Sequence, residues 1–215
     1  ATAFGDNHME LATNMAKSEG LDDEQILLLK QIGLTVNYNS YGQTVDDLFY
    51  SPEEIAKAVK ACGSDIFCFT EQSDIFSTLL KNFSNDMSSA VCQEPYSISD
   101  NGVIYKLPNE SWTHRVMGSF SNHLVSTNKD LACAIAVLNS DETYRISVRS
   151  SINNPHGAGD LCKKFGGGGR EKAAGINNLP DSELEEFKEE FEKLFGKQGW
   201  PPEGDLCPKL NGHHH

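Results

Sequence analysis

The sequence lacks several features that mark membrane proteins and broad nucleic-acid binders. Its 215 residues include no run of eighteen apolar residues, so we expect no membrane-spanning helix and no membrane partner. Basic residues are outnumbered, with 18 Lys and Arg against 31 Asp and Glu, which gives a formal net charge of −13. This balance argues against non-specific duplex binding, which requires many phosphates to be neutralised, but it leaves room for a small basic pocket.

The cysteines follow no disulfide or zinc-site spacing. The chain has no Cys-x-x-Cys pair and no His at zinc-finger distance from its six cysteines, which are Cys62, Cys68, Cys92, Cys133, Cys162 and Cys207. We therefore expect reduced thiols in a cytoplasmic protein. The N-terminus has neither an initiator Met nor the regions of a signal peptide, so we interpret the chain as cut from a longer one. The terminal His213 to His215 resembles a tag remnant.

The first half of the chain is predicted to be helical. Asp22 and Gln25 form a capping pair ahead of apolar residues at helical spacing, and Ser51-Pro52 is a typical helix start. The polar and aromatic stretch 37–42 is predicted to be a loop. A further helical pattern begins at Ile75.

The second half alternates between strand and helix patterns. Asp100-Asn101-Gly102 predicts a hairpin turn, and the near-continuous apolar run 131–138 predicts a buried strand. In the next predicted strand Tyr144, Ile146 and Val148 alternate with Arg145, Ser147 and Arg149. Ser182 and Glu185 predict a capping box at the last helix, whose expected inward residues include Leu194. This order indicates an α/β domain of about 100 residues with a central sheet.

A run of four glycines is the most informative feature. Glycine loses the most backbone freedom on folding, so a folded domain keeps such a run where backbone approaches a ligand closely or adopts positive φ. Successive N–H groups in such a loop can bind an anion, and the guanidinium of the following Arg suits phosphate. The predicted phosphate-binding residues are therefore Gly166, Gly167, Gly168, Gly169 and Arg170. The alternative is a flexible linker, which regular structure on both sides makes the weaker interpretation.

With Ala173-Ala174-Gly175 behind it, this run resembles the DHHA1 signature of several glycines, a histidine, two variable residues and Ala-Ala-Gly. Arg170 stands where the histidine usually does. Ser147 to Ser150 resembles the family's Ser-x-Arg-Ser strand, and 160–165 resembles the helix before the glycines. The chain is thus similar to the C-terminal part of a DHH-family phosphoesterase.

The resemblance implies a division of the chain and further site residues. It implies a helical remainder of a DHH catalytic domain at 1–50, connecting helices at 51–94, a DHHA1 domain with a central mixed sheet at 95–196 and a loose tail at 197–215. By analogy, Arg149 and Ser150 contact a substrate phosphate or carboxylate; the alternative for Arg149 is a solvated surface residue.

Members of this family hold one or two Mn²⁺ ions through four Asp- and His-bearing motifs. Asp6 occupies the place of the fourth motif, so the resemblance implies that it is a metal ligand; the alternative is that Asp6 caps a helix. Neither Asp-x-Asp nor Asp-His-His occurs in the chain. We therefore expect the chain alone to be inactive.

We predict the C-terminal part of a manganese-dependent phosphoesterase that binds nucleic acid or a small nucleotide substrate. A non-catalytic binding module is the main alternative. An acyl-transfer or amino-acid-transfer function ranks lower, because no nucleophile stands out. Oligomeric state stays open, with a homodimer among the outcomes.

Overall fold

The computed structural model describes residues 1–71 and 74–196. The chain divides into two compact units: unit 1 contains Ala1–Asp86 with His114–Val116, and unit 2 contains Met87–Thr113 and the chain from Met117 onward. Within the described ranges, no helix has both the length and the apolar character needed to cross a bilayer. The predicted tail at 197–215 lies outside the described residues.

Unit 1 is helical, as expected, and two of its helices begin at the predicted caps. The capping box of Asp22 and Gln25 opens α3, and that of Ser51 and Glu54 opens α4 with Pro52 at the first position. Its elements are α1 (Thr2–Gly5), α2 (Met9–Ser18), α3 (Asp23–Tyr38), η1 (Val45–Asp47), α4 (Pro52–Ala61), α5 (Cys68–Glu71) and most of α6 (Asp74–Val91).

Helices α1 and α3 pack backbone against backbone. A Cβ on Gly33 would lie 2.3 Å from the carbonyl oxygen of Ala1 and 2.8 Å from the nitrogen of Gly5. Gly33 sits inside α3, where glycine is unfavourable relative to alanine, so this close approach explains its presence. The same helices share an apolar cluster that includes Phe4, Ile26 and Leu29.

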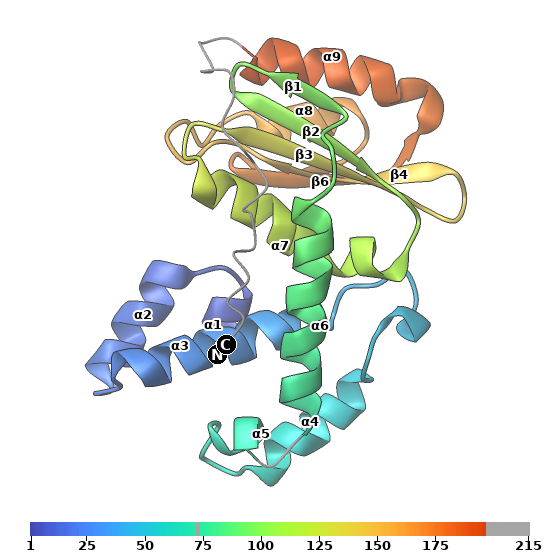
Figure 1. Ribbon diagram of the computed structural model, residues 1–215. Coiled ribbons are helices and arrows are strands. Elements are labelled where there is room, and N and C mark those ends of the chain that lie inside the picture. The colour runs from blue at the N-terminus through green and yellow to red at the C-terminus, as the bar shows by residue number, and fades with distance from the viewer. Residues whose placement is uncertain (72–73, 197–215) are drawn as a thin grey trace, which may run out of the picture. The chain divides into compact units, whose positions relative to one another are not determined.

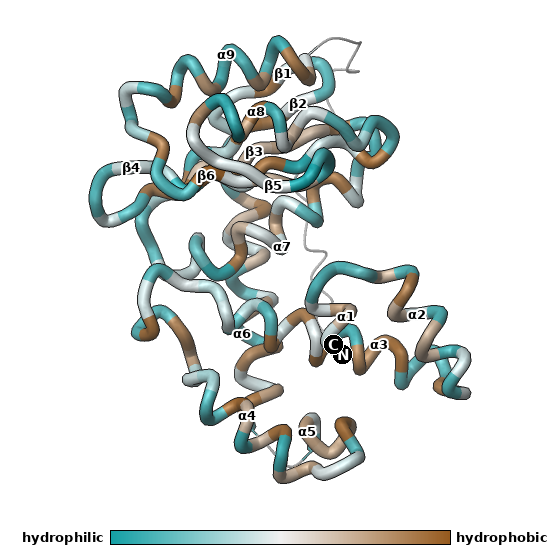
Figure 2. Tube along the Cα trace, turned by 180° about the vertical axis from the view of Figure 1, so that it is seen from behind, coloured by the Kyte–Doolittle hydropathy of each residue, from teal (hydrophilic) through white to brown (hydrophobic). Residues whose placement is uncertain are grey.

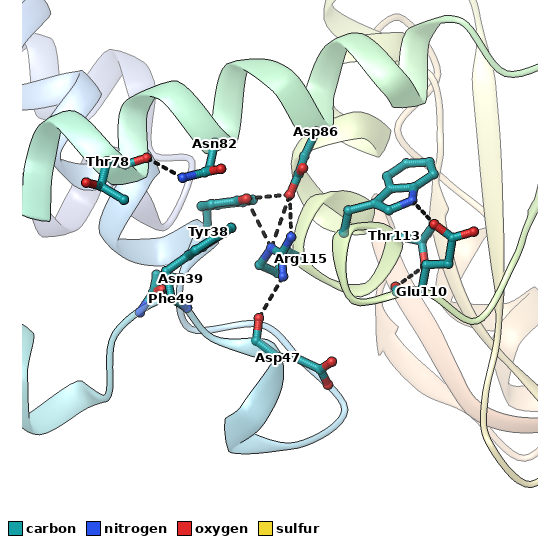
Figure 3. A network of polar contacts seen from close by, with 11 residues as sticks. Tyr38, Asn39, Asp47, Phe49, Thr78, Asn82, Asp86, Glu110, Thr113 and Arg115 are labelled. Atoms are coloured by element: carbon teal, nitrogen blue, oxygen red, sulfur yellow. Dashed lines mark hydrogen bonds and ion pairs between the residues drawn. The ribbon is translucent and has the colours of Figure 1, made fainter.

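A buried polar network within unit 1 corrects the prediction of a loop from residue 37. Tyr38 is the last residue of α3, and its ring is fully buried. Its hydroxyl donates to the carboxylate of Asp86, which also lies 2.8 Å from Nη2 of Arg115. Arg115 further donates from Nη1 to the backbone oxygen of Asp47 at 2.7 Å and lies over the ring of Phe49 (Figure 3). The aromatic residues that suggested a loop are therefore partly core.

Unit 2 is built on a six-stranded sheet in the order β1-β2-β3-β4-β6-β5. Figure 1 shows β1, β2 and β3 side by side below α9. Strands β2 and β3 are parallel and the other neighbouring pairs antiparallel, so the sheet is mixed, as predicted. The hairpin at Asp100-Asn101 is confirmed. The strands are β1 (Ser97–Ser99), β2 (Gly102–Leu107), β3 (Ala132–Leu138), β4 (Thr143–Arg149), β5 (Gly168–Arg170) and β6 (Ala173–Pro180).

Helices cover both faces of this sheet. On one face α8 (Ala158–Lys164) and α9 (Leu184–Phe195) enclose a core that contains Ile146, Val148 and Phe187. On the other face α7 (Ser111–Thr127) packs Phe120 edge-on against Tyr105 of β2, with ring centroids 4.9 Å apart. Figure 2 shows hydrophilic and hydrophobic residues alternating along α9, as an amphipathic surface helix requires.

The start of α9 differs from the predicted capping box. Asp181–Glu183 form the 3-10 helix η2, and no side chain caps α9 within the described part of the chain. The predicted inward position of Leu194 is also wrong, because its side chain is 49% exposed. A Cβ on Gly157 would lie 2.9 Å from Leu194 Cδ2, so the residue covers the loop that enters α8 rather than the core.

Candidate phosphate-binding face and groove

The glycine run divides into a helix cap and a strand. Gly166, at φ +73°, donates its N–H to the carbonyl of Lys163 at 3.3 Å, and Gly167 donates to that of Cys162 at 2.8 Å. This is the paired bonding of a Schellman cap, in which glycine supplies the left-handed residue that ends the helix. The N–H groups of Gly166 and Gly167 are therefore engaged within the protein. Of the amides that were predicted to bind an anion, the helix cap leaves only those after Gly167.

The rest of the run is the edge strand β5, not the loop that we predicted. A Cβ on Gly167 would lie 2.3 Å from the carbonyl oxygen of Gly175, and one on Gly169 would lie 2.5 Å from Ala174 Cα. These two glycines allow the close approach of β6. Gly168 differs, because a Cβ there would meet nothing within 4 Å. It is exposed and faces open space.

The two predicted arginines point to the same side of the sheet. Arg149 of β4 pairs with Ala173 of β6, which in turn pairs with Arg170 of β5. Directly paired residues of antiparallel strands share a face, so both arginines lie on the face that α7 covers in part. One rung further, Ser147 pairs with Gly175, which pairs with Gly168. Between the arginines the sheet thus carries only a methyl group and bare backbone.

Arg149 is held in place by neighbours that sequence reasoning did not select. Its Nε donates to Asn122 Oδ1 of α7 at 3.0 Å, and its Nη1 donates to Ser147 Oγ at 3.0 Å. Ser121 Oγ in turn donates to Ser147 Oγ at 3.1 Å. The alternation of Ser147 with Arg149 was visible in the sequence, but a contact with α7 was not. The side chain of Arg170 makes no hydrogen bond or ion pair to the described residues and is exposed.

Arg145 is a further cation that the sequence analysis did not propose as a site residue. It lies on β4 two residues before Ser147 and therefore on the same face as Arg149. Its Nε is buried without a hydrogen-bond partner in the described part of the chain. The strand alternation Arg145, Ser147, Arg149 was the signal that could have indicated it.

Ser150 is turned into the protein. It is 4% exposed, and its Oγ lies 2.8 Å from the carbonyl oxygen of His156 and 2.9 Å from that of Glu171. The same Oγ accepts the N–H of Ala158 at 3.2 Å. The hydroxyl thus ties the loop before α8 to the β5–β6 turn, and this geometry supports a positioning role rather than direct contact with a ligand.

Two thiols of unit 2, Cys133 and Cys162, are buried. Burial raises the pKa of Cys133, which pairs with Arg149 across β3 and β4, to about 12, and that of Cys162 likewise to about 12. The charge of Arg149 acts in the opposite direction in both cases and does not overcome burial. Both thiols therefore stay protonated at neutral pH.

A groove of about 630 Å³ lies at the end of β5 where the helix cap begins. This volume is in the range of small-molecule sites. Eight residues line the groove: Phe165, Gly166, Gly167, Gly168, Gly175, Ile176, Asn177 and Asn178. Five of them come from the predicted glycine motif and its flanking Phe165, whereas the two asparagines were not predicted.

Asp6 does not form a metal site in the described residues. It is exposed and follows the last residue of α1. The predicted alternative, a cap at the positive end of the following helix, is wrong, since His8 occupies the N-cap position of α2 and Asp6 is instead the C-cap residue of α1. Across residues 1–71 and 74–196, no three His, Cys, Asp or Glu side chains converge in a way that could hold a metal ion. The donors present therefore do not fit a resident Mn²⁺.

The comparisons with known proteins agree with this architecture. Residues 99–197 match the model of the DHHA1 domain. No match to a curated protein was found by sequence. Among solved structures, RecJ in complex with Mg²⁺ from Thermus thermophilus aligns with TM-score 0.55 and 13% identity over 94% of this chain and 30% of that one. Exonuclease RecJ bound to manganese aligns with TM-score 0.55 and 14% identity over 96% of this chain and 49% of that one.

These alignments show the fold, and they show how much of each RecJ structure the chain covers. At such identities the likeness to the two RecJ structures concerns the fold alone. The chain spans less than half the length of either protein. Residues 99–197 of the chain therefore belong to the DHHA1 domain family.

Proposed function

We propose that this chain is the substrate-binding part of a DHH-family phosphoesterase and that its DHHA1 domain holds the phosphate of a nucleic acid or nucleotide. One observation carries the proposal. Arg149 and Arg170 point to the same side of the sheet across Ala173, with Gly168 and Gly175 exposing backbone beside them. Guanidinium groups bind phosphate through two parallel hydrogen bonds, so two of them around a bare floor form an anion site.

The fixed geometry of Arg149 supports this use. Asn122 and Ser147 accept hydrogen bonds from its Nε and Nη1, so little side-chain freedom is left to lose when a phosphate binds. Arg170, exposed on the edge strand, supplies the more adaptable second contact. The small basic face is also compatible with the acidic chain, because it neutralises few phosphates.

Catalysis, in this proposal, belongs to a longer protein. Two solved structures of similar fold are exonuclease RecJ bound to manganese and a RecJ in complex with Mg²⁺, and the chain spans only part of each. Because the described residues offer no metal site, this chain supplies binding and position but not the reaction. For that longer protein we also propose that Asp6 is a metal ligand and that Mn²⁺ is the cofactor. Residues 1–50 would be the remainder of its catalytic domain, and residues 51–94 the connecting helices.

The second candidate is a non-catalytic binding module. The observation that favours it is the same lack of converging metal donors in the described residues. Activity of the full-length parent separates the two: hydrolysis of short DNA or RNA favours the enzyme, and inactivity of a folded, metal-loaded parent favours the module.

The test of phosphate binding uses Arg149→Ala and Arg170→Ala. Affinity for a short single-stranded oligonucleotide is measured by calorimetry at several salt concentrations. Each loss should cost about 1.5–3 kcal/mol, because a hydrogen bond to a charged group is removed. The slope of log affinity against log salt should flatten by about 0.7 for one phosphate contact on a single strand.

Lys193→Ala is the matched control. Its ammonium lies on α9, which covers the opposite face of the sheet, so the variant removes one positive charge without touching the proposed site. We expect its affinity to stay close to that of the unchanged chain. Equal small losses in all three variants would mean that net charge, rather than the arginine face, governs binding.

A further inference from the structure

Two cysteines of unit 1 meet where α4 ends and α5 begins. Cys62 is the C-cap residue of α4, and Cys68 is the first residue of α5. Figures 1 and 2 both show α5 beside the end of α4. The side chains of the two cysteines hydrogen-bond to each other, and both are free thiols. Sγ of Cys62 also donates to the carbonyl oxygen of Ala58 at 3.5 Å, which holds this thiol at the helix end.

Backbone hydrogen bonds fix the loop that brings the two thiols together. Gly63 adopts a left-handed φ of +61° and ends α4 by donating to the carbonyl oxygen of Lys60 at 3.2 Å. The N–H of Asp65 donates to the carbonyl oxygen of Cys62, and the N–H of Cys68 donates to that of Asp65, both at 3.2 Å. Two successive turns thus carry the chain from one cysteine to the other. The backbone therefore keeps the two sulfur atoms close.

The apolar core of unit 1 supports this loop. Cys62 packs against a cluster whose buried members are Ile32, Phe69 and Phe76. Phe69 follows Cys68 directly and is fully buried, and its ring lies edge-on to that of Phe76 at a centroid distance of 6.2 Å. Helix α5 is therefore anchored through the residue next to Cys68. The two cysteines themselves are only half-buried, so a small molecule can reach them.

The hydrogen bond between the thiols assigns them different roles. It is the largest cause that raises the pKa of Cys68 to about 11, ahead of burial and of the negative charges at Cys62, Asp65 and Glu71. A hydrogen bond raises the pKa of a thiol when that thiol is the protonated donor, so Cys68 donates and the sulfur of Cys62 accepts. Thiolate is the reactive form of cysteine, and little of it exists on Cys68 at neutral pH. Cys62 is therefore the first nucleophile of the pair.

We propose that Cys62 and Cys68 form a redox-active dithiol, a modification site that closes to a disulfide on reaction with a small uncharged disulfide. The Cys62 thiolate attacks one sulfur of the reagent, which breaks the S–S bond of the reagent, releases one small thiol and leaves a mixed disulfide on Cys62. Cys68 then loses its proton and displaces the second small thiol as the bond between Cys62 and Cys68 forms. The two electrons and two protons that the cysteines lose are carried away by the two small thiols.

The surroundings of the pair select the reagent and help to complete the reaction. After the first step the sulfur of Cys62 is part of a mixed disulfide, so the hydrogen bond that most raised the pKa of Cys68 is lost and its thiolate becomes available. The carboxylates of Asp65 and Glu71 repel anionic reagents, which favours an uncharged one. The dithiol lies in unit 1, whereas the proposed phosphate site lies in unit 2.

The test treats the whole chain with hydroxyethyl disulfide and follows the tryptic peptide 61–81, which contains both cysteines and no internal Lys or Arg, by mass spectrometry. Cys92→Ser and Cys207→Ser are introduced first, so that only the buried Cys133 and Cys162 remain beside the pair. The peptide should lose two hydrogen atoms and carry no adduct, and dithiothreitol should restore both thiols. A peptide that keeps both thiols, or that carries an adduct on each, would overturn the proposal.

Single variants test the order of attack. Cys68→Ser should trap the mixed disulfide, so that the peptide gains one hydroxyethylthio group on Cys62. Cys62→Ser removes the first nucleophile and should leave Cys68 largely unmodified over the same time. Ser64→Ala changes the loop without changing a thiol and is the matched control, which should cross-link like the unchanged pair. Faster modification of Cys62→Ser than of Cys68→Ser would overturn the assigned order.

Phenylarsine oxide provides a second readout, which reports the spacing of the two sulfur atoms without oxidation. Its arsenic binds two neighbouring thiols and releases water, whereas a single thiol holds it weakly. The chain with both Cys62 and Cys68 should retain the arsenical on peptide 61–81 after washing, and either single serine variant should release it. Release by the chain that has both thiols would contradict their proximity.

Discussion

Gly167 in the helix cap and Gly168 in the strand should respond very differently to substitution by alanine. In Gly167→Ala, the added methyl would lie 2.3 Å from the backbone oxygen of Gly175 and 2.7 Å from Ile176 Cγ1. Relief requires β5 to move off β6, so we expect a cost near the top of the overpacking range, about 3 kcal/mol. For a unit of roughly 100 residues this lowers the melting temperature by roughly 15 °C.

Gly168→Ala should leave stability almost unchanged. A Cβ there meets nothing within 4 Å, and the backbone is not left-handed, so alanine fits without strain. We expect a change within about 0.5 kcal/mol, or a small gain because alanine restricts the unfolded chain. Affinity for a short oligonucleotide should nevertheless fall, since the methyl projects into the space that a ligand would use.

Scanning calorimetry of both variants, followed by titration with the oligonucleotide, measures the two effects separately. The reasoning is refuted if Gly168→Ala melts as early as Gly167→Ala. Unchanged affinity in a folded Gly168→Ala protein would remove this strand from the ligand-binding surface. Gly168→Val enlarges the obstruction while keeping a side chain suited to a strand.

Four further outcomes follow from the buried groups and the missing donors. Arg115→Ala should cost about 3–5 kcal/mol in urea unfolding, because it leaves the carboxylate of Asp86 buried without its cation. Burial above all, and also the hydrogen bond to Asp86, raise the pKa of Tyr38. The stability that its protonated hydroxyl contributes is therefore complete below the ordinary tyrosine pKa of 10.0 and is lost as pH rises above it. Tyr38→Phe should remove this alkaline loss of stability, and an identical pH profile in both proteins would contradict it. Iodoacetamide should modify the exposed Cys92 in the folded chain but Cys133 and Cys162 only after unfolding, as mass spectrometry can check. The 215-residue chain should release no nucleotide from short DNA or RNA with or without Mn²⁺, and metal-dependent turnover would contradict the division of labour proposed above.

Local signals in the sequence predicted the elements that depend on local chemistry. The capping pair at Asp22, the helix start at Ser51-Pro52 and the hairpin turn at Asp100-Asn101 are confirmed, because each is decided by a few neighbouring residues. The mixed α/β class is also confirmed. The box predicted at Ser182 failed, since residues 181–183 form a tighter 3-10 turn against the end of β6.

The features that escaped prediction are tertiary. Gly33 in mid-helix is explained only by the backbone of Ala1 and Gly5 against it. Burial of Tyr38 depends on Asp86 and Arg115, which are distant in the chain. Strand β6 contains a β-bulge at Asn177 and Asn178, where its pairing with β4 shifts register. This bulge leaves no mark in the sequence, because any residue of a strand can be the additional one. The candidate site was therefore predicted as a list of residues, but their common face was not.

The division of the glycine run between cap and strand makes the length of the run a structural constraint. Residue 167 completes the end of α8 and residue 168 begins β5, with no spacer between them. The two-residue turn at 171–172 holds Arg170 opposite Ala173, so one glycine added to the run cannot be taken up by shifting Arg170. It would have to be accommodated at the end of α8, where Gly166 and Gly167 already close the helix. The length of the run thus couples the end of α8 to the register of the β5–β6 hairpin.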